Sequence, residues 1–211
     1  MSLMNQCISA QQIIISMKDS IKEKIKKEIR LWSKDQLEPP NPEFNNLPVC
    51  PYAKKAWADK KVGFVFKTKL YENNIIYKFL EKWDDSKDLI IVVDMNFVED
   101  TKEFHDNLDD INEDISENDF GDQDLWVMGF HPYQEVNELI DDGNFEGETE
   151  EEYALIFIQR LSKLEKASEK LISQGYYETY FDTYEVEQMY VLRKEYYRRL
   201  QNAWIEESRA S

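Results

Sequence analysis

An unbroken apolar run, Leu89-Ile90-Ile91-Val92-Val93, constrains the fold of this chain more than any other feature. A run of this kind, rich in β-branched residues, is typical of a strand that is buried on both faces of a sheet. Residues 62–69 (VGFVFKTK) and 125–130 (LWVMGF) also have the composition of strands. We therefore expect an α/β or α+β fold, with a small open sheet of about three strands (62–69, 89–93 and 125–130) packed with helices. Neighbouring strands are expected to be parallel, following the usual crossover rule.

Helical periodicity surrounds these strands and predicts N-terminal and C-terminal helices as well. The helices are expected over residues 8–32, 72–83, 97–116, 150–172 and 186–204, and Gly175 is expected to end the fourth of them. Five of the six prolines fall within residues 33–51, which predicts a Pro-rich loop because proline lacks an N–H group and restricts the residue before it.

The length of 211 residues favours a single domain, 1–211, in which residues 176–206 form a C-terminal helical appendage to the core. Two cysteines cannot form a disulfide framework. The mean hydropathy is −0.67, and no apolar run approaches the roughly 20 residues that a membrane span needs. Free cysteines and the lack of an export signal predict a cytoplasmic protein. The abundance of Lys, Asn, Ile and Tyr fits an AT-rich genome, such as that of some phages or marine bacteria.

The formal net charge is −17, and the negative charge is concentrated in one stretch. Residues 94–152 hold 22 Asp and Glu against a single basic residue, Lys102. A field of this sign repels nucleic-acid phosphates and anionic lipids. It suits a solvated face, a docking face for a basic protein partner, a mimic of nucleic acid, or divalent-cation sites.

Cys50 is the first candidate for chemistry. Pro51 suits the first position of a short helix, so Cys50 is expected to be its N-cap. Unpaired backbone N–H groups at that position favour the thiolate and predict a lowered pKa, and Lys54 adds positive potential. Tyr52 and Lys54 are the neighbouring candidates for binding. The competing interpretation is a buried, inert cysteine.

His131 is the second candidate, because it follows the third predicted strand, where α/β sheets commonly place their sites. If it meets Cys50, the two form a thiol–imidazole pair of nucleophile and base. Phe130 and Tyr133, which flank it closely, are further candidates for binding. The competing interpretation is a strand-end histidine that bonds a nearby backbone group or carboxylate.

The order of these motifs resembles a bacterial family of unknown function. That family carries Cys-Pro-Phe-Ala early and Phe-His-Pro after a strand, and this chain has Cys50-Pro51-Tyr52-Ala53 and Phe130-His131-Pro132. The resemblance covers about residues 47–171 and implies a single-domain α+β fold, with no established reaction. A second, weaker resemblance links Cys50–Ala53 to the CPYC motif of thioredoxins, without the second cysteine.

No metal or cofactor is predicted. Cysteine and histidine are too few for a zinc site, and the acidic loops lack the glutamate that an EF-hand needs at its twelfth position. No glycine-rich phosphate loop is present. Asp94, at the end of the apolar run, is expected to cap its strand. The sequence therefore favours a binding or regulatory protein without catalysis, and the alternative is a thiol-dependent enzyme that uses Cys50 and His131.

Overall fold

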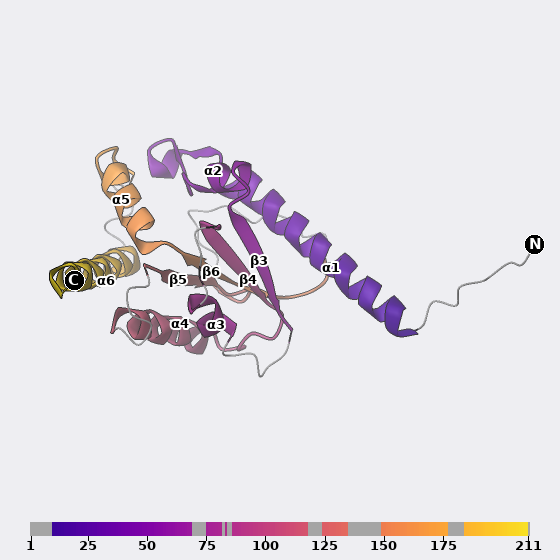
Figure 1. The fold of residues 1–211 in the computed structure, drawn as a ribbon. Coiled ribbons are helices and arrows are strands. Elements are labelled where there is room, and N and C mark those ends of the chain that lie inside the picture. Colours follow the sequence, from indigo (N-terminus) through magenta and orange to yellow (C-terminus); the bar gives the residue numbers. More distant parts are fainter. Residues whose placement is uncertain are drawn as a thin grey trace, which may run out of the picture.

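A four-stranded mixed sheet forms the centre of the protein. Figure 1 shows the computed structural model, which describes residues 10–68, 75–81, 83, 86–117, 124–134, 149–176 and 184–210. The strands, in chain order, are β3 (Val62–Lys67), β4 (Leu89–Asp94), β5 (Trp126–Phe130) and β6 (Ala154–Gln159). Their order across the sheet is β3-β4-β6-β5. The α+β fold that the sequence predicts is confirmed, with all three expected strands present.

The fourth strand, β6, corrects the prediction of one helix over residues 150–172. Residues Ala154–Gln159 form a strand that pairs antiparallel with both β4 and β5. Only β3 and β4 pair in parallel, so the expectation of parallel neighbours is right for that pair and wrong for the others. The run ALIFI is buried on both faces of the sheet, and a short apolar run of this kind has no periodicity that separates strand from helix.

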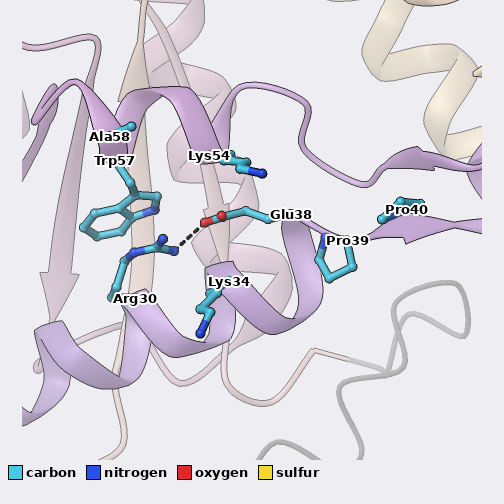
Figure 2. Close-up of a pocket in the computed structure, with 8 residues that line it drawn as sticks. All are labelled: Arg30, Lys34, Glu38, Pro39, Pro40, Lys54, Trp57 and Ala58. Atoms are coloured by element: carbon cyan, nitrogen blue, oxygen red, sulfur yellow. Dashed lines mark hydrogen bonds and ion pairs between the residues drawn. The ribbon is translucent and has the colours of Figure 1, made fainter.

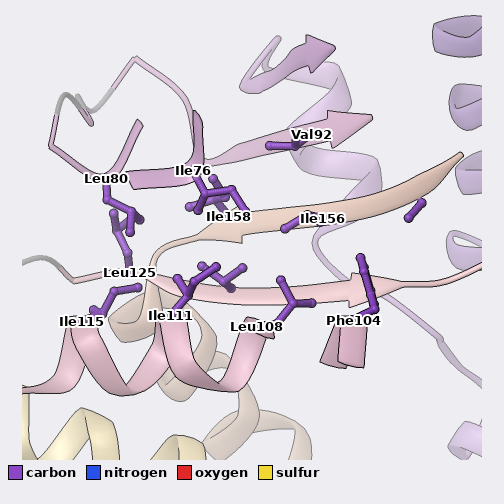
Figure 3. Packing of buried hydrophobic residues seen from close by; sticks show 12 residues of the cluster. Ile76, Leu80, Val92, Phe104, Leu108, Ile111, Ile115, Leu125, Ile156 and Ile158 are labelled. Carbon is purple, nitrogen blue, oxygen red and sulfur yellow. The ribbon is translucent and has the colours of Figure 1, made fainter. Parts of the chain in front are cut away.

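One face of the sheet is covered by α3 (Ile75–Leu80) and α4 (Thr101–Ser116). Figure 3 shows apolar side chains of these helices pointing at strand residues such as Val92, Ile156 and Ile158. The helix contacts come from Ile76, Leu80, Phe104, Leu108, Ile111 and Ile115. The acidic helix expected over residues 97–116 is thus present from Thr101, where the side chain of Asp100 accepts a hydrogen bond from the N–H of Glu103. Residues 72–74 and 82 of the helix expected over 72–83, and residue 69 of the strand expected over 62–69, lie outside the described residues.

The opposite face is covered by α1 (Ala10–Trp32), which crosses it, and by the short helix α2 (Ala53–Ala58). Ile25 and Ile29 of α1 are buried against Ile91, Val93 and Phe157, as the apolar stripe of the first predicted helix requires. The sheet therefore lies between two helical layers (Figure 1).

Two C-terminal helices pack beside β5. Helix α5 (Leu161–Ile172) begins eleven residues later than expected and ends near Gly175, whose φ of 73° is the left-handed conformation that glycine adopts readily. Helix α6 (Tyr184–Ala210) is longer than the expected 186–204. Its residue Tyr196 is buried and packs against Trp126 of β5 with ring centroids 5.9 Å apart.

The Pro-rich segment is more ordered than a plain loop. Residues Ser33–Leu37 continue α1 as a π-helical turn, because the first proline comes only at Pro39. Strands β1 (Pro40–Asn41) and β2 (Leu47–Pro48) then form a two-stranded ladder around a 3-10 turn, Pro42–Phe44. Phe44 packs on Leu171 and Tyr176, which ties this segment to the end of α5.

Asn112 joins α4 to the open edge of the sheet. Its side chain, 3% exposed, accepts from the N–H of Val127 at 2.9 Å and donates to the C=O of Val127 at 2.8 Å. These two backbone groups belong to β5, the last strand in the sheet order. The amide of Asn112 therefore supplies the hydrogen bonds that a further strand would have supplied.

We predict that Asn112→Ala lowers the free energy of unfolding by about 2–4 kcal/mol, because it leaves a buried N–H and a buried C=O without partners. Asn107→Ala, an exposed position of the same helix, is the matched control and should change it by less than about 0.5 kcal/mol. Urea unfolding followed by circular dichroism measures both. Equal unfolding midpoints for the two variants would contradict this role of Asn112.

Candidate functional site

Cys50 is half-buried, and its backbone groups are hydrogen-bonded within the turns that precede α2. Helix α2 begins at Ala53 with Tyr52 as its N-cap, so the prediction that Cys50 is the N-cap is wrong. The N–H of Cys50 donates to the C=O of Leu37 at 2.9 Å, and its own C=O accepts from Ala53. Burial raises the pKa of the Cys50 thiol and outweighs the N–H groups of Tyr52 and Ala53, which lower it. The predicted lowering of the pKa is therefore wrong, although the N–H groups that motivated it are present.

His131 lies directly after β5 and is 4% exposed. Its Nε2 lies 2.8 Å from the C=O of Val98, which can only accept, so Nε2 carries the proton. Its Nδ1 accepts from the N–H of Tyr133 at 3.1 Å, and the hydroxyl of Thr101 lies 3.3 Å away. The imidazole therefore connects β5 to the start of α4, and both ring nitrogens have partners.

Aromatic rings complete the surroundings of His131. The ring centroids of Phe97, Phe104 and Tyr133 lie 5.1, 5.2 and 5.4 Å from its own. This packing matches the interpretation of a strand-end histidine with local partners.

Cys50 and His131 belong to separate parts of the fold. Cys50 precedes α2 and the N-terminal end of β3, whereas His131 follows the C-terminal end of β5, and β3 and β5 run in the same direction. Among the described residues, the groups that contact the thiol segment (Leu37, Glu38, Tyr52, Ala53) share no member with those around His131. The thiol–imidazole pair has no geometric basis in this arrangement.

The predicted binding residues divide between the same two regions. Phe130 packs edge-on against Trp32 and Phe157, with ring centroids 5.8 and 5.4 Å away. Tyr133 is exposed and its hydroxyl donates to Glu152. Tyr52 is exposed at the start of α2, and Lys54 lines a pocket beside that helix. The sequence offered no reason to link Lys54 with the other lining residues, since most of them come from α1 and the turn after it.

The carboxyl ends of β3 and β4 hold a buried ion pair that sequence reasoning did not find. Lys67 Nζ lies 2.7 Å from Asp94 Oδ2, and the other carboxylate oxygen accepts from the N–H of Asn96 at 3.0 Å. Asp94 thus caps its strand as predicted. The pairing with Lys67 follows from the parallel register of β3 and β4, which sets these two residues opposite each other.

The acidic stretch is partly visible in the structure. Its residues 118–123 and 135–148 lie outside the described residues. Five exposed acidic residues lie on one side of α4 and at its C-cap, and we call them the acidic surface: Glu103, Asp106, Asp109, Asp110 and Glu117. No group of three or more His, Cys, Asp or Glu side chains in the described part of the chain has an arrangement suited to a metal ion.

The chain matches no protein-family model, no curated protein and no solved structure. The resemblance to the family with Cys-Pro-Phe-Ala and Phe-His-Pro motifs therefore stays a prediction. In the part of the chain that the structure describes, no helix is both long enough and apolar enough to cross a membrane.

We predict that Cys50 is alkylated slowly, with a pH midpoint above that of an exposed cysteine, because desolvation of the half-buried side chain favours the neutral thiol. The same shift means that the thiol contributes stability below its unfolded pKa, and that this contribution is lost as the pH rises above it. Iodoacetamide labelling of Cys7→Ser, followed by mass spectrometry between pH 6 and 10, measures the midpoint.

The matched comparison for this labelling is Cys7→Ser combined with His131→Ala. It should show the same midpoint if the imidazole does not act on the thiol. A midpoint below 8.5 that rises when His131 is removed would restore the thiol–imidazole pair.

Proposed function

We propose that this chain is a binding or regulatory protein without catalysis, and that its acidic surface docks a cationic protein partner. The observation that carries the proposal is the placement of the acidic surface opposite the packed face of α4. At 100° per residue, Glu103, Asp106, Asp110 and Glu117 fall within a stripe about 60° wide. Phe104, Leu108, Ile111 and Ile115 occupy the other side of the helix, against the sheet.

Little positive charge offsets this surface. Lys102, the one lysine of the acidic stretch, forms an ion pair with Asp106. Asp109 is exposed, but partial desolvation raises its pKa; His105 lowers this pKa, and the negative charges of Asp106 and Asp110 raise it further. Like charges three or four residues apart destabilise a helix by roughly 0.2–0.5 kcal/mol per pair. A cationic partner would relieve this repulsion.

Other acidic residues in or next to this helix make hydrogen bonds that stabilise the fold. We therefore do not count them in the acidic surface. Asp100 caps the helix, Asp114 accepts from the hydroxyl of Tyr77 at 2.8 Å, and Glu113 accepts from Tyr196 and bonds Arg199. The acidic surface has no comparable bonds to other elements in the described part of the chain. Its charge is therefore available to a partner without disturbing the packing of α4.

The surroundings of Cys50 and His131 weigh against the alternative of a thiol-dependent enzyme. Such an enzyme needs the sulfur within hydrogen-bond reach of a base that has a free lone pair. The Nδ1 lone pair of His131 already accepts a backbone hydrogen bond, and the thiol lies in another part of the fold.

We predict that Asp106→Asn, Asp109→Asn and Asp110→Asn together weaken binding of a fluorescein-labelled octalysine peptide by about fivefold or more in 50 mM salt. The same triple variant should unfold at an equal or higher urea concentration, because it removes like-charge repulsion within α4. Fluorescence anisotropy measures the first quantity and circular dichroism the second.

The control carries the same change in net charge at three exposed positions elsewhere: Asp19→Asn, Glu81→Gln and Glu169→Gln. It should bind the peptide with nearly the affinity of the unaltered chain. Equal losses in the two triple variants would mean that only net charge matters, and the proposal of a docking surface on α4 would fail.

A further inference from the structure

A pocket of about 650 Å³ lies between the end of α1, the turn that follows it, and α2. Figure 2 shows the residues that line it: Arg30, Lys34, Glu38, Pro39, Pro40, Lys54, Trp57 and Ala58. The volume is within the usual range of roughly 300–1,000 Å³ for small-molecule sites. The pocket lies on the face of the sheet opposite α4, so it is separate from the acidic surface.

The charge of this pocket is opposite to that of the whole chain. Its lining includes three cationic side chains and one carboxylate, that of Glu38. Glu38 forms an ion pair with Arg30, and its side chain is only 9% exposed. Lys34 and Lys54 are exposed, and neither has an acidic partner within 4 Å among the described residues. The two ammonium groups are therefore uncompensated within the pocket.

The sequence around the pocket reinforces this local field. Residues 18–61 hold 11 Lys and Arg against 7 Asp and Glu, although the chain as a whole carries −17. Exposed charges act over about 10 Å at 0.1 M salt, so the charged lining residues Arg30, Lys34, Lys54 and Glu38 outweigh charges that lie farther away. An anion is therefore attracted to this region and repelled by the α4 side.

Arg30 is held in place for binding an anion. Its guanidinium lies over the indole of Trp57, 5.0 Å from the ring centroid, and one of its terminal nitrogens bonds Glu38. The indole is itself fixed, since its N–H donates to the hydroxyl of Ser33 at 2.9 Å. A guanidinium has five N–H donors, so one bond to Glu38 leaves others for an anionic oxygen.

We propose that this pocket binds a small organic phosphate monoester that carries an aromatic ring, of about the size of a nucleoside monophosphate. A phosphate monoester has a charge near −2 at neutral pH, which matches the two uncompensated lysines, and its oxygens can accept from Arg30. Pro39, Pro40 and Ala58 provide apolar surface for the ring at the same pocket. Neither a free phosphate ion nor an uncharged nucleoside would use both parts of the lining.

Isothermal titration calorimetry with adenosine 5′-monophosphate (AMP), inorganic phosphate and adenosine tests the proposal on the full chain in 150 mM salt. We expect AMP to bind with a dissociation constant of about 0.1–1 mM, and the other two to bind at least about fivefold more weakly. Lys34→Gln with Lys54→Gln should weaken AMP binding about fivefold to tenfold. Both positions are exposed, so the double variant is expected to fold.

Lys24→Gln with Lys78→Gln is the matched control, because these lysines are exposed and do not line the pocket. It should bind AMP as the unaltered chain does. Lack of AMP binding by the unaltered chain, or equal losses in the two double variants, would overturn the proposal. Adenosine binding as tightly as AMP would overturn the role of the phosphate, and inorganic phosphate binding as tightly would overturn the role of the ring.

Discussion

Strand β6 is the element on which the rest of the structure depends, because it alone connects the β3–β4 pair to β5 by hydrogen bonds. Its alternate residues face the two helical layers, with Ile156 and Ile158 toward α4 and Phe157 toward α1. Burial of apolar area on both sides at roughly 25 cal/mol per Å² makes this strand a central contributor to stability. Without it, β5 would have no hydrogen-bonded neighbour in the sheet.

The position of β5 at the open edge explains two polar features that contact it. An edge strand exposes unpaired N–H and C=O groups, which invite pairing with another chain. Asn112 satisfies one N–H and one C=O of this edge, and His131 fixes the end of the strand to Val98 and the start of α4. The helix that carries the acidic surface is thus held by specific hydrogen bonds as well as by apolar packing.

The sheet also separates two regions of opposite charge. Helix α4 carries the acidic surface on one side of the sheet. The end of α1 and the turn after it bring Arg30 and Lys34 near Lys54 on the other side (Figures 1 and 2). Each region keeps its own potential because exposed charges are screened over about 10 Å at 0.1 M salt. The two proposals for this protein therefore concern different surfaces and different ligands, and one can fail while the other holds.

The sequence by itself determined the elements whose patterns are local. The run LIIVV, the periodicity of α1 and α4, the stop at Gly175 and the cap at Asp94 all follow from residues that are near each other in the chain. The tertiary structure alone decided whether Ala154–Gln159 forms strand or helix, because an apolar run suits either one and only a place between β4 and β5 selects the strand. It also decided the pKa of Cys50 and the hydrogen-bond partners of His131, since burial and partners depend on segments far away in the sequence. The pocket around Trp57 could not be predicted from the sequence for the same reason. Its cationic residues become neighbours only when α2 folds back onto the end of α1.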